Sequence, residues 1–258
     1  MVTVLVAAAC GVLGLAVGSF LNVLVWRVPR KESVVHPRSH CPSCDTQLAS
    51  RDNVPVASWV LLGGRCRTCS DRISVRYPLL ELGCAALFAA TAAHFGLSFP
   101  LPAYLVLAAS LLALSVIDLE HRLLPNKIIF PTGYALAVLL LLAALAEGEP
   151  RRIAWAAIGA AGAFGMFFAL HFIAPGGMAY GDVRLSFLLG MAVGWLGLGL
   201  VPLFLFVAFL TSAVTGVVYA ALTGQGLKAS IPFGPFLALG AEMAIFVGRP
   251  LVDAYLGR

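Results

Sequence analysis

Residues 2–26 read VTVLVAAACGVLGLAVGSFLNVLVW and contain no Asp, Glu, Lys or Arg. At about 1.5 Å per helical residue, this segment is long enough to cross the roughly 30 Å hydrocarbon core of a bilayer. A cleaved signal peptide is the alternative interpretation. However, no basic residue precedes the apolar run, which is also longer than the roughly 7–15 residues usual for such peptides. We therefore expect the first transmembrane helix at residues 1–26.

The rest of the chain also has the composition of a membrane protein. Of its 258 residues, 60% are hydrophobic and 11% are charged, and the mean hydropathy is +0.95. An ordinary soluble domain carries roughly a quarter charged residues, and disordered chains are far less apolar. The sequence therefore predicts an all-α polytopic membrane protein with about eight transmembrane helices. The seven further apolar segments are Tyr77–Leu97, Leu101–Ile117, Phe130–Ala146, Ile153–Ala174, Val183–Gly199, Leu200–Leu222 and Phe233–Leu251.

A polar, turn-rich and basic segment at residues 27–76 separates the first two spans. Placing it in the cytoplasm puts thirteen of the 17 Lys and Arg residues on that side, as the positive-inside rule favours. We expect a small cytoplasmic domain at 27–76 and a membrane-embedded region with about seven helices at 77–258. Topology explains the net charge of +5, so a nucleic-acid partner is not expected. The basic residues left on the other side are Arg151, Arg152, Arg249 and Arg258.

Four of the six cysteines form two C-x-x-C motifs in this domain, Cys41/Cys44 and Cys66/Cys69. Two such turns supply the closed tetrahedral shell of a structural zinc site, and four thiolates leave no position for a catalytic water. The domain therefore resembles a zinc ribbon that binds Zn²⁺. A redox-active cysteine pair is the alternative, although thiols are kept reduced in the cytoplasm.

Acidic residues at membrane depth are costly and are therefore candidates for function. Asp118 and Asp182 follow or precede apolar segments on the same predicted side, so their carboxyl groups can meet. Two carboxyl groups in contact cannot both ionise cheaply, so one keeps a proton while the other acts as a base. Asp182 as a helix N-cap and Asp118 as a simple helix-end residue are the alternatives. The other acidic residues at this depth are Glu81, expected to extend to the membrane surface, Glu120 and Glu242.

Gly181 directly precedes Asp182 in the turn before the next apolar segment. Glycine adopts backbone conformations closed to other residues and allows another chain to approach closely. We expect Gly181 to support the catalytic loop in this way.

Five separate motifs resemble those of the type IV prepilin peptidases, the leader peptidase and N-methyltransferase family. They cover nearly the whole chain and occur in the family's order. They are Gly18-Ser19-Phe20-Leu21-Asn22-Val23 with Trp26-Arg27-Val28-Pro29; Asn53-Val54-Pro55, Ser58-Trp59, the two cysteine pairs and Arg76-Tyr77-Pro78-Leu79-Leu80-Glu81-Leu82; Asp118 with Leu124-Pro125-Asn126 and Pro131; Gly181-Asp182-Val183-Arg184-Leu185; and Ile231-Pro232-Phe233-Gly234-Pro235-Phe236.

This resemblance implies a GxGD-type intramembrane aspartic peptidase of the bacterial inner membrane. Asp118 and Asp182 would be its catalytic pair at the cytoplasmic face, where it removes the basic leader of prepilins and pseudopilins. Family members commonly also methylate the new N-terminus with S-adenosylmethionine, although no residue here identifies a methyl-donor site. The sequence leaves the oligomeric state open.

One departure from the family pattern is Ala179, which stands where GxGD has its first glycine. If that position needed a positive φ, alanine would strain the turn by about 1 kcal/mol or more. Two other functions remain as alternatives: a proton-coupled membrane transporter, and a thiol-disulfide oxidoreductase with a cytoplasmic cysteine domain.

Overall fold

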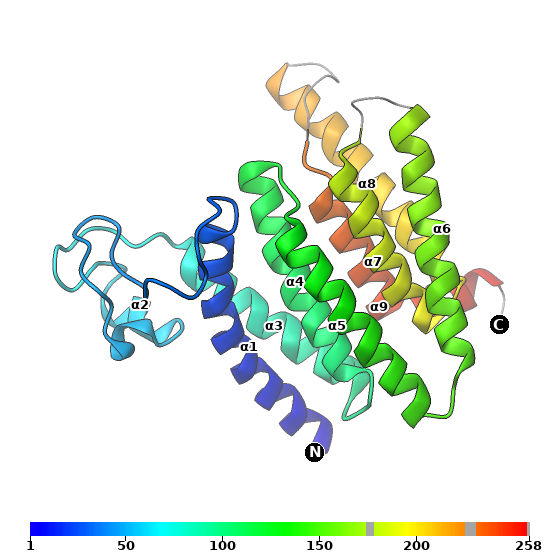
Figure 1. The fold of residues 1–258 in the computed structure, drawn as a ribbon, viewed down its shortest axis with the longest axis horizontal. Coiled ribbons are helices and arrows are strands. Elements are labelled where there is room, and N and C mark those ends of the chain that lie inside the picture. The colour runs from blue at the N-terminus through cyan, green and yellow to red at the C-terminus, as the bar shows by residue number, and fades with distance from the viewer. Residues whose placement is uncertain (174–177, 225–230, 257–258) are drawn as a thin grey trace. The chain divides into compact units, whose positions relative to one another are not determined.

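The computed structural model describes residues 1–173, 178–224 and 231–256 (Figure 1). In this part of the chain the secondary structure is helical, apart from two isolated β-bridges. The prediction of an all-α protein is therefore confirmed. The elements are α1 (Val2–Arg27), η1 (Ser50–Asn53), α2 (Ala57–Leu61), α3 (Arg76–Phe95), α4 (Leu101–His121), α5 (Asn126–Ala146), α6 (Arg151–Ile173), α7 (Tyr180–Leu196), α8 (Leu200–Thr223) and α9 (Gly234–Leu256).

Seven of the described helices are long and apolar enough to cross a membrane, namely α1, α3, α4, α5, α6, α8 and α9. Helix α7, the remaining predicted span, has 17 residues, which is the lower end of the lengths that can cross a bilayer. The break between α7 and α8 falls at residues 197–199, and Pro202 is tolerated in the first turn of α8. Ala174 and Arg258 lie outside the described residues.

The chain divides into two compact units. The first comprises residues 1–101 and 105–113, and the second comprises residues 102–104 and 114–258, so α4 contributes to both. The polar segment with the four cysteines belongs to the first unit, and both Asp118 and Asp182 belong to the second.

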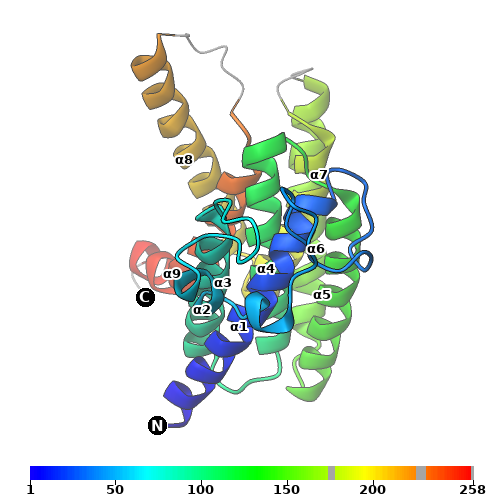
Figure 2. The same ribbon diagram turned by 90° about the vertical axis from the view of Figure 1, so that its left-hand side faces the viewer.

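In the first unit, α1 lies along α3 (Figures 1 and 2). Glycines permit this close approach, because a Cβ added to Gly14 or Gly18 would come within 2.7 Å of the α3 backbone. Small residues at such spacing let helices pack closely in lipid. Asn22 adds a polar contact between the two segments, since its Nδ2 donates to the carbonyl oxygen of Tyr77 at 3.2 Å.

Glu81 differs from the sequence prediction, which had it extending to the membrane surface. Its side chain is buried, and Oε2 accepts a hydrogen bond from the backbone N–H of Val56 at 2.7 Å. Val56 directly precedes α2. A carboxylate that satisfies a main-chain donor has a reason to stay inside, and Glu81 therefore ties the polar segment to α3.

In the second unit, α6 packs on α7 and α8 packs on α9. Two of the arginines assigned to the non-cytoplasmic side have structural partners here. Arg152 pairs with Glu147 at 2.9 Å, and its Cζ lies 4.6 Å from the ring centroid of Trp195. Arg249 donates to the carbonyl oxygen of Leu196, the last residue of α7, where a cation is favoured by the helix dipole.

Candidate functional site

Asp118 lies in the last turn of α4 and is 5% exposed. Its Oδ2 accepts a hydrogen bond from the backbone N–H of Gly234 at 2.9 Å. Gly234 is the first residue of α9, and the first amides of a helix have no partner within the helix. The start of α9 therefore supplies a donor that fixes one oxygen of the Asp118 carboxyl group.

Gly234 has no room for a side chain. A Cβ at this position would lie 2.7 Å from Asp118 Oδ2 and 3.1 Å from Leu124 Cδ2. Any other residue would have to push the carboxyl group away from the amide that holds it.

Asp182 lies in the first turn of α7 and is 6% exposed. It is not the N-cap that the sequence left open as an alternative, because Ala179 occupies that position. Instead, Asp182 Oδ2 accepts from the backbone N–H of Ala179 at 3.2 Å, as the acidic residue of a capping box does. The backbone N–H of Asp182 donates in return to the carbonyl oxygen of Ala179 at 3.0 Å.

The turn before Asp182 corrects two expectations about its small residues. Ala179 has φ −77° and ψ 146°, an ordinary extended conformation, so the strain considered for it is absent. Gly181 lies inside α7 without a positive φ, so its conformational freedom is not what the site uses. A Cβ on Gly181 would lie 2.9 Å from Leu124 Cβ, so Gly181 is needed for space.

Leu124 connects the two acidic segments. It precedes α5, is largely buried, and contacts both Gly181 and Gly234. The helix starts that hold Asp182 and Asp118 therefore pack against the same side chain.

A second link joins the two segments at the surface. Arg184 Nη1 donates to Asn126 Oδ1 at 2.7 Å, and its Cζ lies 4.5 Å from the ring centroid of Tyr180. Neither aspartate forms an ion pair in the part of the chain that the structure describes. The guanidinium group thus joins α5 to α7 without neutralising Asp182.

The four cysteines of the polar segment are free thiols whose Sγ atoms all lie within 4.8 Å of one another. A tetrahedral site with metal–sulfur bonds of about 2.3 Å has sulfur–sulfur edges of about 3.8 Å. Cys41 Sγ and Cys69 Sγ lie 3.8 Å apart. The cluster therefore has the dimensions of a metal site, whereas one disulfide would involve only two of the four sulfurs.

The two cysteine turns share one backbone design that the sequence analysis did not find. The N–H of Cys41 donates to Thr46, and that of Cys66 donates to Asp71. The residue after each second cysteine has a positive φ, 59° at Asp45 and 60° at Ser70. Backbone N–H groups of Cys69 and Thr68 lower the pKa of the Cys66 thiol to about 6, which favours the thiolate that binds metals.

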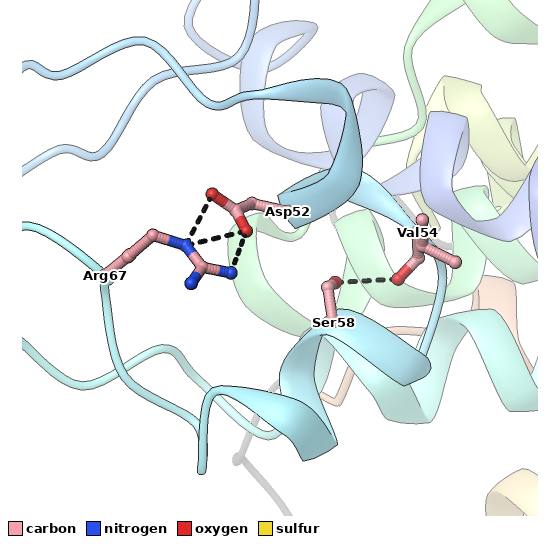
Figure 3. A network of polar contacts seen from close by, with 4 residues as sticks. All are labelled: Asp52, Val54, Ser58 and Arg67. Carbon is pink, nitrogen blue, oxygen red and sulfur yellow. Dashed lines mark hydrogen bonds and ion pairs between the residues drawn. The ribbon is translucent and has the colours of Figure 1, made fainter.

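An ion pair outside the cluster holds the second cysteine turn to η1. The Arg67 guanidinium contacts the Asp52 carboxylate with Nη2–Oδ1 at 2.6 Å and Nε–Oδ1 at 3.1 Å (Figure 3). Figure 3 also shows Ser58 Oγ donating to the carbonyl oxygen of Val54, four residues earlier, at 2.7 Å.

Sequence reasoning assigned no role to Gly234, Leu124, Asn126 or Arg184. All four lie in motifs that carried the family resemblance, so the signal was present in the sequence. Their roles depend on contacts between segments that are distant along the chain, and only the structure supplies those contacts.

Comparisons with known proteins show which proteins the chain is similar to. A model of the bacterial peptidase A24 N-terminal domain matches residues 12–95, and a model of the type IV leader peptidase family matches residues 105–221. A Stutzerimonas stutzeri protein named prepilin leader peptidase/N-methyltransferase is 34% identical, over 95% of this chain and 92% of its own. A Pseudomonas aeruginosa protein of the same name is 33% identical, over 95% and 91%.

A third relative carries a related name. An Escherichia coli protein named type 4 prepilin-like proteins leader peptide-processing enzyme is 37% identical, over 91% of each chain. No solved structure matches the chain.

Proposed function

The chain belongs to the type IV leader peptidase family, and we propose that it is an integral membrane aspartic endopeptidase that removes the leader peptide of type IV prepilins and pseudopilins. The names of the relatives supply the substrate class. The observation that carries the chemistry is the pair of buried carboxyl groups, Asp118 and Asp182, each held by one main-chain N–H.

In this proposal the two aspartates divide the acid and base roles. Two buried carboxyl groups that act on one another favour a state in which one is ionised and the other protonated. The ionised group removes a proton from water as the water attacks the scissile carbonyl carbon, and the protonated group donates its proton to the leaving amine. Within the described residues, Oδ1 of neither aspartate accepts a hydrogen bond, which leaves one oxygen on each for water or substrate.

Charge distribution supports the placement of this site. With the cysteine-containing segment in the cytoplasm, thirteen of the 17 basic residues lie on that side. We infer an inner-membrane protein with its active site toward the cytoplasm, where the basic leader of the substrate would remain while its apolar helix enters the bilayer.

The two sites give different roles to different regions of the chain. The first span at 1–26 and a zinc-binding domain at 27–76 would precede a peptidase region at 77–258. Cys41, Cys44, Cys66 and Cys69 would hold the Zn²⁺, and four thiolates fill its shell, so the metal would stabilise the domain rather than activate water. By the names of its relatives, the enzyme would also methylate the new N-terminus, with S-adenosylmethionine as the donor.

Co-expression with a candidate prepilin tests this proposal. Mass spectrometry of the pilin recovered from membranes would measure the loss of the leader and the mass of the new N-terminus. We expect a shortened pilin that carries one additional methyl group. An uncut prepilin would contradict the peptidase function, and a shortened pilin without the methyl group would contradict only the second activity.

A further inference from the structure

A cavity of about 340 Å³ lies at the C-terminal end of α1, between that helix and the polar segment of the first unit. Its polar lining includes Arg27, Arg38, Ser50 and Asn53, and its apolar lining includes Val23 and Leu48. No acidic residue lines it. The peptidase chemistry uses none of these side chains.

Arg27 is a buried cation without an anionic partner. Its side chain is 7% exposed, and its two terminal nitrogens donate to the carbonyl oxygens of Ser33 and Pro37 at 2.9 and 2.7 Å. These neutral acceptors satisfy N–H groups but leave the charge uncompensated. Among the described residues no carboxylate pairs with Arg27, although buried charges in proteins are normally paired.

Arg38 brings a second positive charge to the same cavity. Its side chain is exposed and makes no hydrogen bond or ion pair within the part of the chain that the structure describes. Two guanidinium groups, one buried and one free, with hydroxyl and amide groups beside them, form an environment suited to an anion with several oxygens.

The position of the cavity identifies the source of that anion. Arg27 ends the 26-residue helix α1, whose apolar length places this end at the level of the lipid headgroups. Basic pockets at this depth bind the headgroups of anionic lipids. We propose that the cavity binds the phosphate of an anionic phospholipid, with Val23 and Leu48 against the glycerol end of the lipid.

S-adenosylmethionine fits this cavity poorly. The donor carries a sulfonium and an ammonium group against a single carboxylate, so its net charge is positive. A cavity with two arginines and no carboxylate repels such a molecule. The experiment includes S-adenosylmethionine as a competitor to test this expectation. The proposal does not depend on the peptidase function.

Native mass spectrometry of the full-length protein in mild detergent tests the site. The protein is titrated with phosphatidylglycerol and, separately, with phosphatidylcholine. We expect phosphatidylglycerol to be retained at lower concentration than phosphatidylcholine, and the Arg38→Gln variant to bind it about fivefold more weakly, as loss of one cationic contact near a membrane surface implies. Arg38→Glu should lose more than Arg38→Gln.

Arg72→Gln is the matched control, because Arg72 is an exposed arginine of the same segment that does not line the cavity. It should bind phosphatidylglycerol like the wild type. Arg38 is chosen over Arg27 because replacing Arg27 would also remove two contacts that hold the loop.

Four results would overturn the proposal. The first two are equal retention of the two lipids and unchanged binding by both Arg38 variants. The third is displacement of the lipid by millimolar inorganic phosphate, which would assign the site to a free anion. The fourth is displacement of the lipid by S-adenosylmethionine, which would assign the site to the methyl donor.

Discussion

Replacing Gly234 by alanine tests how the structure holds Asp118. The added Cβ would lie 2.7 Å from Asp118 Oδ2, inside the contact distance of carbon and oxygen, so the carboxyl group must move away from the Gly234 amide. Hydrogen bonds to charged groups contribute about 1.5–3 kcal/mol. If that contribution is lost in the transition state, kcat falls by roughly 10- to 150-fold.

The assay is cleavage of a purified prepilin by wild-type and variant enzyme in lipid vesicles, with kcat and KM determined separately. The change should appear in kcat, because Gly234 holds Asp118, a proposed catalytic group, rather than the substrate. Gly165→Ala is the matched control, since a Cβ at that position of α6 meets nothing within 4 Å. A Gly234→Ala variant with wild-type kcat would refute the reasoning, and a thermal unfolding profile like that of the control would show that the loss is not misfolding.

Three further predictions concern the contacts around the two sites. Arg184→Ala and Asn126→Ala should each reduce cleavage by about 5-fold, from loss of one exposed hydrogen bond, and the double variant should lose no more than either single variant. Additive losses in this double-mutant cycle would show that the two residues do not act through their 2.7 Å contact. Cys66→Ser should lower the zinc content of the purified protein and make residues 28–75 sensitive to protease. Cys84→Ser on α3 should change neither the zinc content nor the protease sensitivity of that segment. The Arg67 guanidinium holds the pKa of Asp52 below its usual range, so the stability from this pair is present above the usual carboxyl pKa and is lost as pH falls through the lowered value. The protease resistance of the wild-type segment should therefore drop in that acidic range. An Asp52→Asn variant with the same pH profile would argue against the pair.

Sequence reasoning located the helices well because their ends carry strong local signals. The predicted segment Leu200–Leu222 lies within one residue of the observed helix, since proline, glycine and charge interrupt the apolar runs at these points. Other segments differ by up to five residues at one end, as Phe233–Leu251 does from Gly234–Leu256. The four cysteines were grouped correctly for a similar reason, because each C-x-x-C pair is a short-range pattern. The internal repeat of the two cysteine turns was missed, because their flanking residues differ while their backbones agree.

The reasons behind individual site residues were harder to predict. A glycine in a sequence can serve a positive φ or a close contact, and Gly181 proved to serve the contact with Leu124. Ala179 is compatible with the turn because its φ is negative. Glu81 was expected at the membrane surface, but its acceptor role toward Val56 keeps it buried.

Contacts between distant segments were beyond sequence reasoning altogether. The amide of Gly234 and the carboxyl group of Asp118 are 116 residues apart along the chain. No local pattern signals that the start of one helix will supply a hydrogen bond to the end of another. The assignment of Asp118 and Asp182 as the catalytic pair stays a prediction, now with stated contacts for each carboxyl group.

The most direct test of that pair is cleavage of a prepilin by purified Asp118→Asn and Asp182→Asn variants in lipid vesicles, with Glu120→Gln as the control. Asparagine keeps the shape of the side chain but cannot exchange a proton as a carboxyl group does. Both variants should insert into the membrane yet leave the prepilin uncut, while Glu120→Gln cleaves it at the wild-type rate. Cleavage at the wild-type rate by either asparagine variant would contradict the two-aspartate mechanism.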